Sequence, residues 1–211
     1  MALLEVKNLE VSFGLRSGDV KALRNINFTL DRGERLGLVG ESGAGKSVLG
    51  FSILNLISKP GRISDGQILF EGKDLADMSA EELRNVRGNR ISMIFQDPMM
   101  TLNPVLTIGQ QMIECLQAHR KISKEDARTI AIQKLQQVQI PSPETRIDQY
   151  PHELSGGMRQ RVVIAVGLLM DPDIIIADEP TTALDVTIQA EIMELMVELC
   201  ERNNVALILI T

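Results

Sequence analysis

The chain has 211 residues, of which 44% are hydrophobic, and a formal net charge of −6. This length allows one or two domains with a sizeable core. The acidic balance and the lack of a basic stripe argue against a dedicated nucleic-acid binder. The longest apolar run, 162–170, is far too short to cross a bilayer, and the first residues do not have the pattern of a signal peptide. Cys115 and Cys200 imply no disulfide framework, so we expect a cytoplasmic protein.

Apolar residues alternate in the first part of the chain, at 3–13 and 20–30, and predict two strands. Their close spacing favours antiparallel pairing. Further short strands are predicted at 35–39, 67–70 and 91–95, and a turn at 64–66 precedes the second of these. The capping box of Ser79 and Glu82 predicts a helix over 79–87.

The pattern becomes helical between residues 99 and 150. Thr107 and Gln110 form a second capping box, which predicts a helix to about residue 119, and Ser123 caps a further helix that ends before Pro141. After this region, helices are predicted at 155–170 and 185–202, and strands at 174–177 and 205–210. We therefore expect one domain, with a helical subdomain at 98–159 set into a core formed by 1–97 and 160–211.

One stretch of eight residues has a specific chemistry: Gly40, Glu41, Ser42, Gly43, Ala44, Gly45, Lys46 and Ser47. It matches the phosphate-binding loop G-x-x-x-x-G-K-[ST] without a mismatch, and it lies between a predicted strand and the start of a helix. The glycines let the backbone approach a phosphate, and successive N–H groups form an anion site at the helix N-terminus. Lys46 would reach the β- and γ-phosphates, and the Ser47 hydroxyl would bind Mg²⁺.

Asp178 and Glu179 follow the buried strand predicted at 174–177. Ligands of open parallel sheets bind at the carboxyl ends of the strands, so Asp178 would hold Mg²⁺ opposite Ser47. A carboxylate one residue further on, at Glu179, can orient and deprotonate an attacking water.

A second anion site is predicted where Leu154, Ser155, Gly156 and Gly157 open a helix, because backbone N–H groups and the positive helix end point outward there. One nucleotide does not need two such sites from one chain. A dimer could use both, with each chain's second site closing on the other's γ-phosphate. The alternative is a plain helix N-cap by Ser155.

Together these segments resemble an ATP-binding-cassette (ABC) ATPase over essentially the whole chain. The resemblance rests on five motifs in order: Walker A at 40–47, the Q-loop at Gln96, the signature at 154–157 with Gln160, Walker B at 174–179 and the D-loop at 183–185. Segments 95–104 and 150–161 resemble the branch of dipeptide and oligopeptide importers, which also includes nickel importers. The resemblance implies an α/β fold: a P-loop NTPase with a RecA-like, mainly parallel core sheet, an antiparallel β subdomain and an ABC-type helical subdomain.

The resemblance also implies residue roles. Phe13 would stack on adenine, and Lys46 with the amides of the loop would bind the phosphates. Ser47, Gln96 and Asp178 would surround Mg²⁺, and Glu179, Gln96 and Lys46 would be catalytic. The partner's ATP would be bound by Ser155, Gly156 and Gly157, and Asp185 would link the two sites across the dimer interface.

The implied function is that of the ATP-binding and hydrolysing subunit of an importer for di- or oligopeptides or a related solute, driven by ATP-dependent dimerisation. Its implied partners are a second ATPase subunit, identical or related, two membrane permeases and an extracytoplasmic solute-binding protein. The segment after Gln96 would receive a permease helix. This places the chain at the cytoplasmic face of the cell membrane, with no nucleic acid as a partner.

One departure from the family concerns its switch histidine, which follows the strand corresponding to 205–210. The chain ends at Thr211. We therefore expect a chain truncated before that histidine, which keeps the phosphate site but hydrolyses ATP poorly.

Two other functions remain open. A soluble cassette ATPase that acts on DNA or ribosomes shares the Ser-Gly-Gly motif, although the stretch between Gln96 and Ser155 is too short for the coiled coil of chromosome-maintenance ATPases. The other open function, third beside the importer subunit and the soluble cassette ATPase, is a nucleotide-dependent binding module without turnover. Co-purification with permeases rather than with DNA or ribosomes separates the first two, and a hydrolysis assay separates the third.

Overall fold

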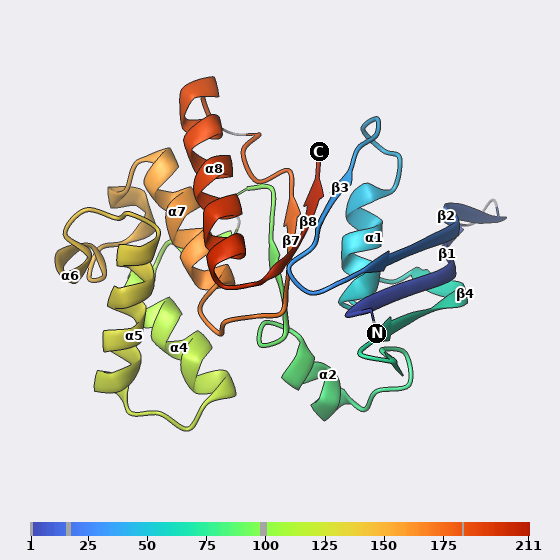
Figure 1. Ribbon diagram of the computed structural model, residues 1–211, viewed down its shortest axis with the longest axis horizontal. Helices are drawn as coiled ribbons and strands as arrows, with labels where there is room; N and C mark the ends of the chain where they lie inside the picture. The colour runs from blue at the N-terminus through green and yellow to red at the C-terminus, as the bar shows by residue number, and fades with distance from the viewer. Residues whose placement is uncertain (1, 16–17, 98–100, 183) are drawn as a thin grey trace.

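The computed structural model describes residues 2–15, 18–97, 101–182 and 184–211 and contains two four-stranded sheets (Figure 1). The antiparallel sheet has the order β2-β1-β4-β5 and consists of β1 (Leu4–Leu15), β2 (Gly18–Leu30), β4 (Gly61–Phe70) and β5 (Lys73–Asp74). The parallel sheet has the order β3-β8-β7-β6 and consists of β3 (Arg35–Leu38), β8 (Ala206–Ile210), β7 (Ile174–Asp178) and β6 (Ile91–Ile94). Helix α1 (Lys46–Ile53) lies between the two sheets.

The parallel sheet separates two hydrophobic cores because its side chains alternate between its faces. On β7, Ile174 and Ile176 pack with α1 and the antiparallel sheet, whereas Ile175 and Ala177 pack with the helices on the other face. Every residue of β7 is buried. The residues that follow this strand are therefore held by a fixed support.

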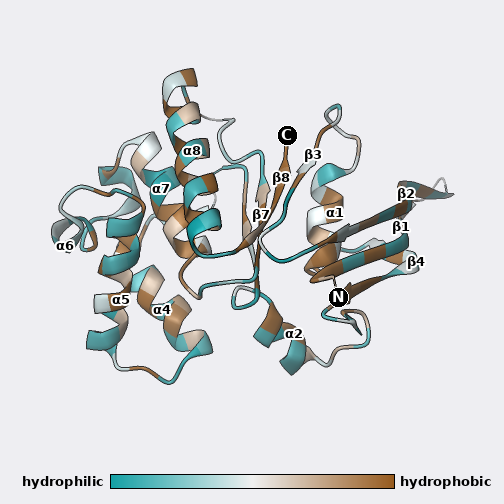
Figure 2. Cartoon of the chain, viewed as in Figure 1, coloured by the Kyte–Doolittle hydropathy of each residue, from teal (hydrophilic) through white to brown (hydrophobic). Residues whose placement is uncertain are grey.

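The helices on the second face are α4 (Ile108–His119), α5 (Lys124–Gln137), α7 (Gly156–Gly167) and α8 (Val186–Arg202). They share one hydrophobic core with the sheet, so the helical region at 101–155 is packed directly against α7 and α8. In Figure 2, α5 and α8 alternate between hydrophobic and hydrophilic bands, as expected for helices with one buried face. The short elements are α2 (Ala80–Val86), α6 (Pro143–Arg146) and the 3₁₀ helix η1 (Pro151–Glu153).

The predicted turn at 64–66 is wrong, because β4 runs through it from Gly61 to Phe70. The register of β1 and β4 shifts between their pairs Lys7–Gln67 and Glu10–Asp65, which marks a bulge. Gly66 has φ +86°, and a Cβ there would lie 2.4 Å from the Asn8 carbonyl oxygen. The turn-like residues thus bend a continuous strand and do not end it. The short elements β5, α6 and η1 were not predicted; Pro143 begins α6 at a position where proline is well tolerated.

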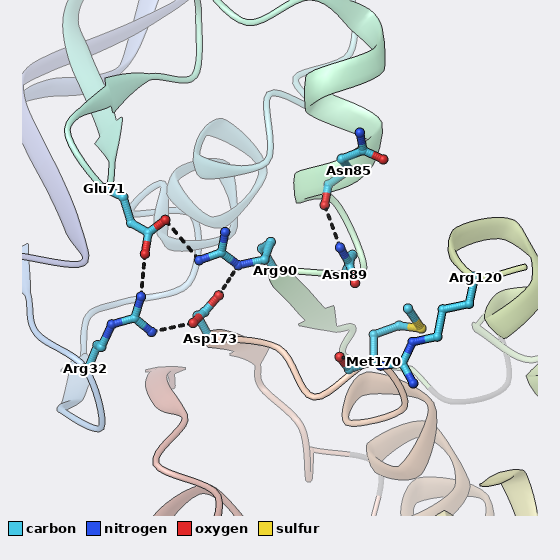
Figure 3. Close-up of polar contacts among 8 residues, drawn as sticks. All are labelled: Arg32, Glu71, Asn85, Asn89, Arg90, Arg120, Met170 and Asp173. Atoms are coloured by element: carbon cyan, nitrogen blue, oxygen red, sulfur yellow. Dashed lines mark hydrogen bonds and ion pairs between the residues drawn. The ribbon is translucent and has the colours of Figure 1, made fainter.

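Four charged side chains form a ring at the end of the parallel sheet where its strands begin (Figure 3). Arg32 and Arg90 each pair with both Glu71 and Asp173. Arg32 precedes β3, Arg90 precedes β6 and Asp173 precedes β7, whereas Glu71 follows β4 of the other sheet. The ring therefore ties the two sheets together at the end opposite to Asp178. In the described parts of the chain, every helix is too short or too polar to cross a membrane.

Candidate functional site

The predicted phosphate loop joins β3 to α1, which begins at Lys46. Gly43 and Gly45 have φ values of +82° and +91°, so both use the backbone region that favours glycine. A Cβ on Gly45 would lie 2.7 Å from the Ala22 carbonyl oxygen of β2, so the loop packs tightly on the antiparallel sheet. No side chain caps α1, and its first N–H groups remain available to an anion.

Lys46 points back across this loop. Its Nζ donates to the carbonyl oxygens of Gly40 at 2.6 Å and Glu41 at 3.0 Å. Glu41, Ser42, Gly43 and Ala44 are exposed. The loop thus presents an ammonium group and free backbone donors at one accessible surface, which is the arrangement that a phosphate group requires.

Ser47 at the start of α1 and Asp178 at the end of β7 lie close together. The Ser47 side chain lies within reach of the Asp178 carboxyl and favours its charged form. Asp178 is only 6% exposed, and its Oδ1 atom is buried without a hydrogen-bond partner. Burial raises the pKa of Asp178, and the nearby Glu179 charge adds to this, against the opposing effects of Ser47 and Lys46. A cation at this place would compensate the buried charge.

Gln96 and Glu179 are also in contact. Gln96 Nε2 donates to Glu179 Oε2 at 2.8 Å, and the Thr182 hydroxyl donates to the same carboxylate oxygen at 3.2 Å. Glu179 has φ +43°, a strained value for this residue type, and its N–H donates to the Ile210 carbonyl oxygen of β8. The strand ends therefore hold this carboxylate in one position beside Asp178.

The second predicted anion site begins α7, where Ser155 Oγ accepts from the Met158 N–H at 3.3 Å. A Cβ on Gly157 would lie 3.0 Å from Ile188 Cγ2, so this helix start packs closely on α8. Asp185 caps α8 by accepting from the Ile188 N–H. Figure 1 shows α7 and α8 on the opposite side of the parallel sheet from α1. The structure therefore places Gly156 and Gly157 against Leu184 and Ile188, on either side of the cap residue Asp185, and across the sheet from the helix that begins with Lys46.

Gln160 lies one turn further along α7 and is completely buried. Neither its Nε2 nor its Oε1 atom has a hydrogen-bond partner. An unpaired buried amide costs about 1–3 kcal/mol. This part of the signature helix therefore carries a polar group that lowers stability.

Phe13, predicted to stack on a base, lines a pocket of about 250 Å³ beside the first turn of α1. The other lining residues are Val48, Phe51, Leu56, Ile57 and Ser58. The sequence prediction missed Phe51. The signal that could have found it is its position in the helix after the phosphate loop. A residue one turn beyond Ser47 can reach a group attached to a bound phosphate.

The donor atoms near Ser47 and Asp178 decide whether a magnesium ion fits at this place. Among the described residues, no group of three or more His, Cys, Asp or Glu side chains lies close enough to hold a metal. The Ser47 hydroxyl, the unpaired Asp178 oxygen and the Gln96 amide oxygen are nevertheless oxygen donors of the kind that Mg²⁺ prefers, and this ion normally takes the rest of its ligands from phosphate and water. The residues present therefore fit Mg²⁺ bound together with a nucleotide.

Comparison with known proteins places this arrangement in a family. A family model described as ABC transporter matches residues 23–182. The oligopeptide transport ATP-binding protein OppD of Bacillus subtilis (strain 168) is 56% identical over 210 residues, which cover 99% of this chain and 59% of the relative. The dipeptide transport ATP-binding protein DppD of Escherichia coli (strain K12) is 50% identical over 211 residues, covering 100% and 64%. The chain thus spans about three fifths of the length of these relatives.

The solved structures support the same assignment. The dimeric post-hydrolysis state of the ATP-binding cassette MJ0796 bound to ADP and Pi has a TM-score of 0.85 and 29% identity, and the match covers 99% of this chain and 87% of that one. CbiO1 from Clostridium perfringens, part of the ABC transporter complex cbiONQ, has a TM-score of 0.82 and 30% identity, covering 100% and 78%. The predicted α/β cassette fold is confirmed, and the chain belongs to the ABC transporter family.

Proposed function

We propose that this chain is the ATP-binding and hydrolysing part of an ABC importer for di- or oligopeptides or a related solute. The observation that carries the proposal is the convergence of the phosphate loop and α1 with Asp178 and Glu179 at the end of β7, where Ser47 meets Asp178 and Gln96 meets Glu179. The names of the similar relatives supply the solute class. The structure adds no argument for DNA or ribosomes as targets.

The proposed chemistry is hydrolysis of the γ-phosphate by positioning and charge neutralisation. The N–H groups at the start of α1 and the Lys46 ammonium bind the phosphates, and Phe13 stacks on the adenine. Glu179 accepts a proton from the attacking water, and Gln96 holds that carboxylate in place through its 2.8 Å hydrogen bond. Ser47, Asp178 and Gln96 would hold Mg²⁺, which would neutralise phosphate charge when bound.

A second copy or a related subunit completes the site. Ser155, Gly156 and Gly157 lie on the far side of the sheet from Lys46, so in this proposal they bind the γ-phosphate of the partner's ATP, and Asp185 links the two sites. The structural neighbour MJ0796, an ATP-binding cassette that forms a dimer bound to ADP and Pi, supports the proposal of a dimer. The further partners are two membrane permeases and an extracytoplasmic binding protein, with this chain at the cytoplasmic face of the membrane.

Equilibrium binding of Mg-ATP tests the nucleotide site. We expect Lys46→Ala to weaken binding by about 10- to 100-fold, because it removes a charge-assisted contact with phosphate. Lys124→Ala is the matched control, since it removes the same charge from an exposed position on α5 and should change the affinity less than about twofold. Equal affinity of the Lys46→Ala variant and the parent protein by calorimetry would exclude the proposed phosphate site.

A further inference from the structure

Phe51 lies between two parts of the site: the pocket that Phe13 lines and the segment that carries Phe95 and Gln96. It lies on α1, one turn after Ser47, and lines the pocket that Phe13 also lines. Its ring also stacks on that of Phe95, with ring centroids 6.2 Å apart and an angle of 25° between the planes. One side chain therefore borders the pocket for the base and contacts the segment that follows β6.

Phe95 is joined directly to Gln96, the residue that holds Glu179 at 2.8 Å. Phe95 is 36% exposed, so neighbouring side chains surround its ring only in part. The Phe95 ring stacks on that of Phe51. Because Phe95 and Gln96 share a peptide unit, a backbone movement that repositions the Phe95 ring also moves the backbone of Gln96.

We propose that Phe51 is a positioning residue that couples a purine base in the pocket to the placement of Gln96 and, through it, of Glu179. The proposal rests on the proposed function, because it takes a nucleoside triphosphate as the ligand. A base that enters the pocket meets Phe13 and Phe51 and limits the orientations of the Phe51 ring. Because the two rings stack, the restricted Phe51 ring also restricts the placement of Phe95, the residue before Gln96.

The size of the effect follows from the stack. An aromatic pair is worth about 0.5–1.5 kcal/mol beyond its buried area, which corresponds to a change of about twofold to tenfold in a conformational equilibrium. A ligand shifts such an equilibrium only if it binds the two states differently. A triphosphate without a base satisfies Lys46 but does not touch Phe51. It should therefore bind without changing the placement of Gln96.

A fluorescence titration tests this coupling. The sequence contains no tryptophan, so Phe95→Trp introduces a single indole next to Gln96 that can still stack on Phe51. We expect saturating Mg-ATP to change the indole emission at least threefold more than saturating Mg-tripolyphosphate, which carries the phosphates alone. Equal changes with both ligands would overturn the proposal, because the signal would then come from the phosphate site.

Second substitutions in the Phe95→Trp background identify the route. At saturating ATP, Phe51→Leu should abolish the ATP-specific part of the signal, and Phe51→Tyr should retain it because the ring remains. Leu56→Ala alters the same pocket outside the stack and should also retain it. Retention in Phe51→Leu, or loss in Leu56→Ala, would overturn the role of Phe51.

The same titrations separate this inference from the proposed function. Calorimetry on the parent protein reports whether ATP binds at all, and thermal unfolding reports whether each variant is folded. ATP that binds without an ATP-specific indole signal contradicts the coupling alone. A folded parent protein that does not bind ATP contradicts the proposed function and the coupling together.

Discussion

At the scale of single residues, the site combines side chains whose positions lower the stability of the fold. Asp178 is almost fully buried and has one carboxylate oxygen without a partner. Glu179 has a positive φ, and Gln160 has an unpaired buried amide. Such groups persist where the surrounding structure fixes them, and they gather at functional sites. We interpret Asp178 in this way because a cation bound with the nucleotide would remove its unfavourable energy.

We predict that Asp178→Asn stabilises the protein and weakens Mg-ATP binding. Burial raises the pKa of Asp178, so the folded state prefers the protonated carboxyl, and stability falls as pH rises through that pKa. The variant should therefore gain about 1–2 kcal/mol at pH 8 and less at pH 4, where a larger share of the parent carboxyl is protonated. Thermal unfolding without nucleotide at both pH values measures the gain. A loss at pH 8, or the same gain at both values, would contradict this account.

At the scale of elements, local signals predicted the helices well. Ser79 and Thr107 form the predicted capping boxes, and Ser123, Ser155 and Asp185 cap the helices that follow them. These signals work because a cap involves residues only three positions apart. The bulge between Asn8 and Gly66 was missed because it depends on a contact between distant strands.

The site shows the same division between local and distant contacts. The residues of the phosphate loop, the strand end and the second helix start could be named from motifs, because each motif is a short segment. The closeness of Ser47 to Asp178 and the Phe51–Phe95 stack could not be derived from the residues alone. They depend on how α1 packs against β6 and β7, which no local pattern determines.

Gly109 gives a prediction about the packing of α4. A Cβ there would lie 2.9 Å from the Ile147 carbonyl oxygen and 2.8 Å from Ile147 Cγ1. Alanine should gain about 1 kcal/mol in helix propensity, but overpacking against a backbone atom costs about 1–3 kcal/mol. We therefore expect Gly109→Ala to destabilise the protein in denaturant unfolding, whereas Glu114→Ala on the exposed face of α4 should change stability by less than about 0.5 kcal/mol. A more stable Gly109→Ala variant would refute this packing.

At the scale of the whole molecule, two cores meet at the parallel sheet, and the charged ring of Arg32, Glu71, Arg90 and Asp173 joins the two sheets at one end (Figure 3). The Arg90 guanidinium also lies over the Phe70 ring, 5.0 Å from its centroid. The opposite end of the parallel sheet carries Asp178 and Glu179. The molecule thus has one end closed by ion pairs and another end where strand ends and loops remain accessible to a ligand.

The ring makes a prediction about pH. Burial opposes ionisation of Asp173, but hydrogen bonds from Arg90 and Arg32 outweigh it and hold its pKa below the ordinary value of 3.8. The stabilisation is therefore present at neutral pH and is lost as pH falls through the folded pKa. Asp173→Asn should cost about 1–3 kcal/mol at pH 7 and progressively less below pH 4 in urea unfolding. The same cost at pH 7 and in strong acid would show that the carboxylate charge is not what matters.

The most direct test of the central claim is sedimentation velocity of the Glu179→Gln variant with and without Mg-ATP. In the proposed dimer, each nucleotide is closed between the Lys46 side of one subunit and the Ser155 side of another. Because the amide keeps the shape of Glu179 but cannot accept the proton from water, the variant should form a dimer with Mg-ATP. It should remain monomeric with Mg-ADP, as should Lys46→Ala/Glu179→Gln with Mg-ATP. A Glu179→Gln variant that binds Mg-ATP by calorimetry and stays monomeric would contradict the claim.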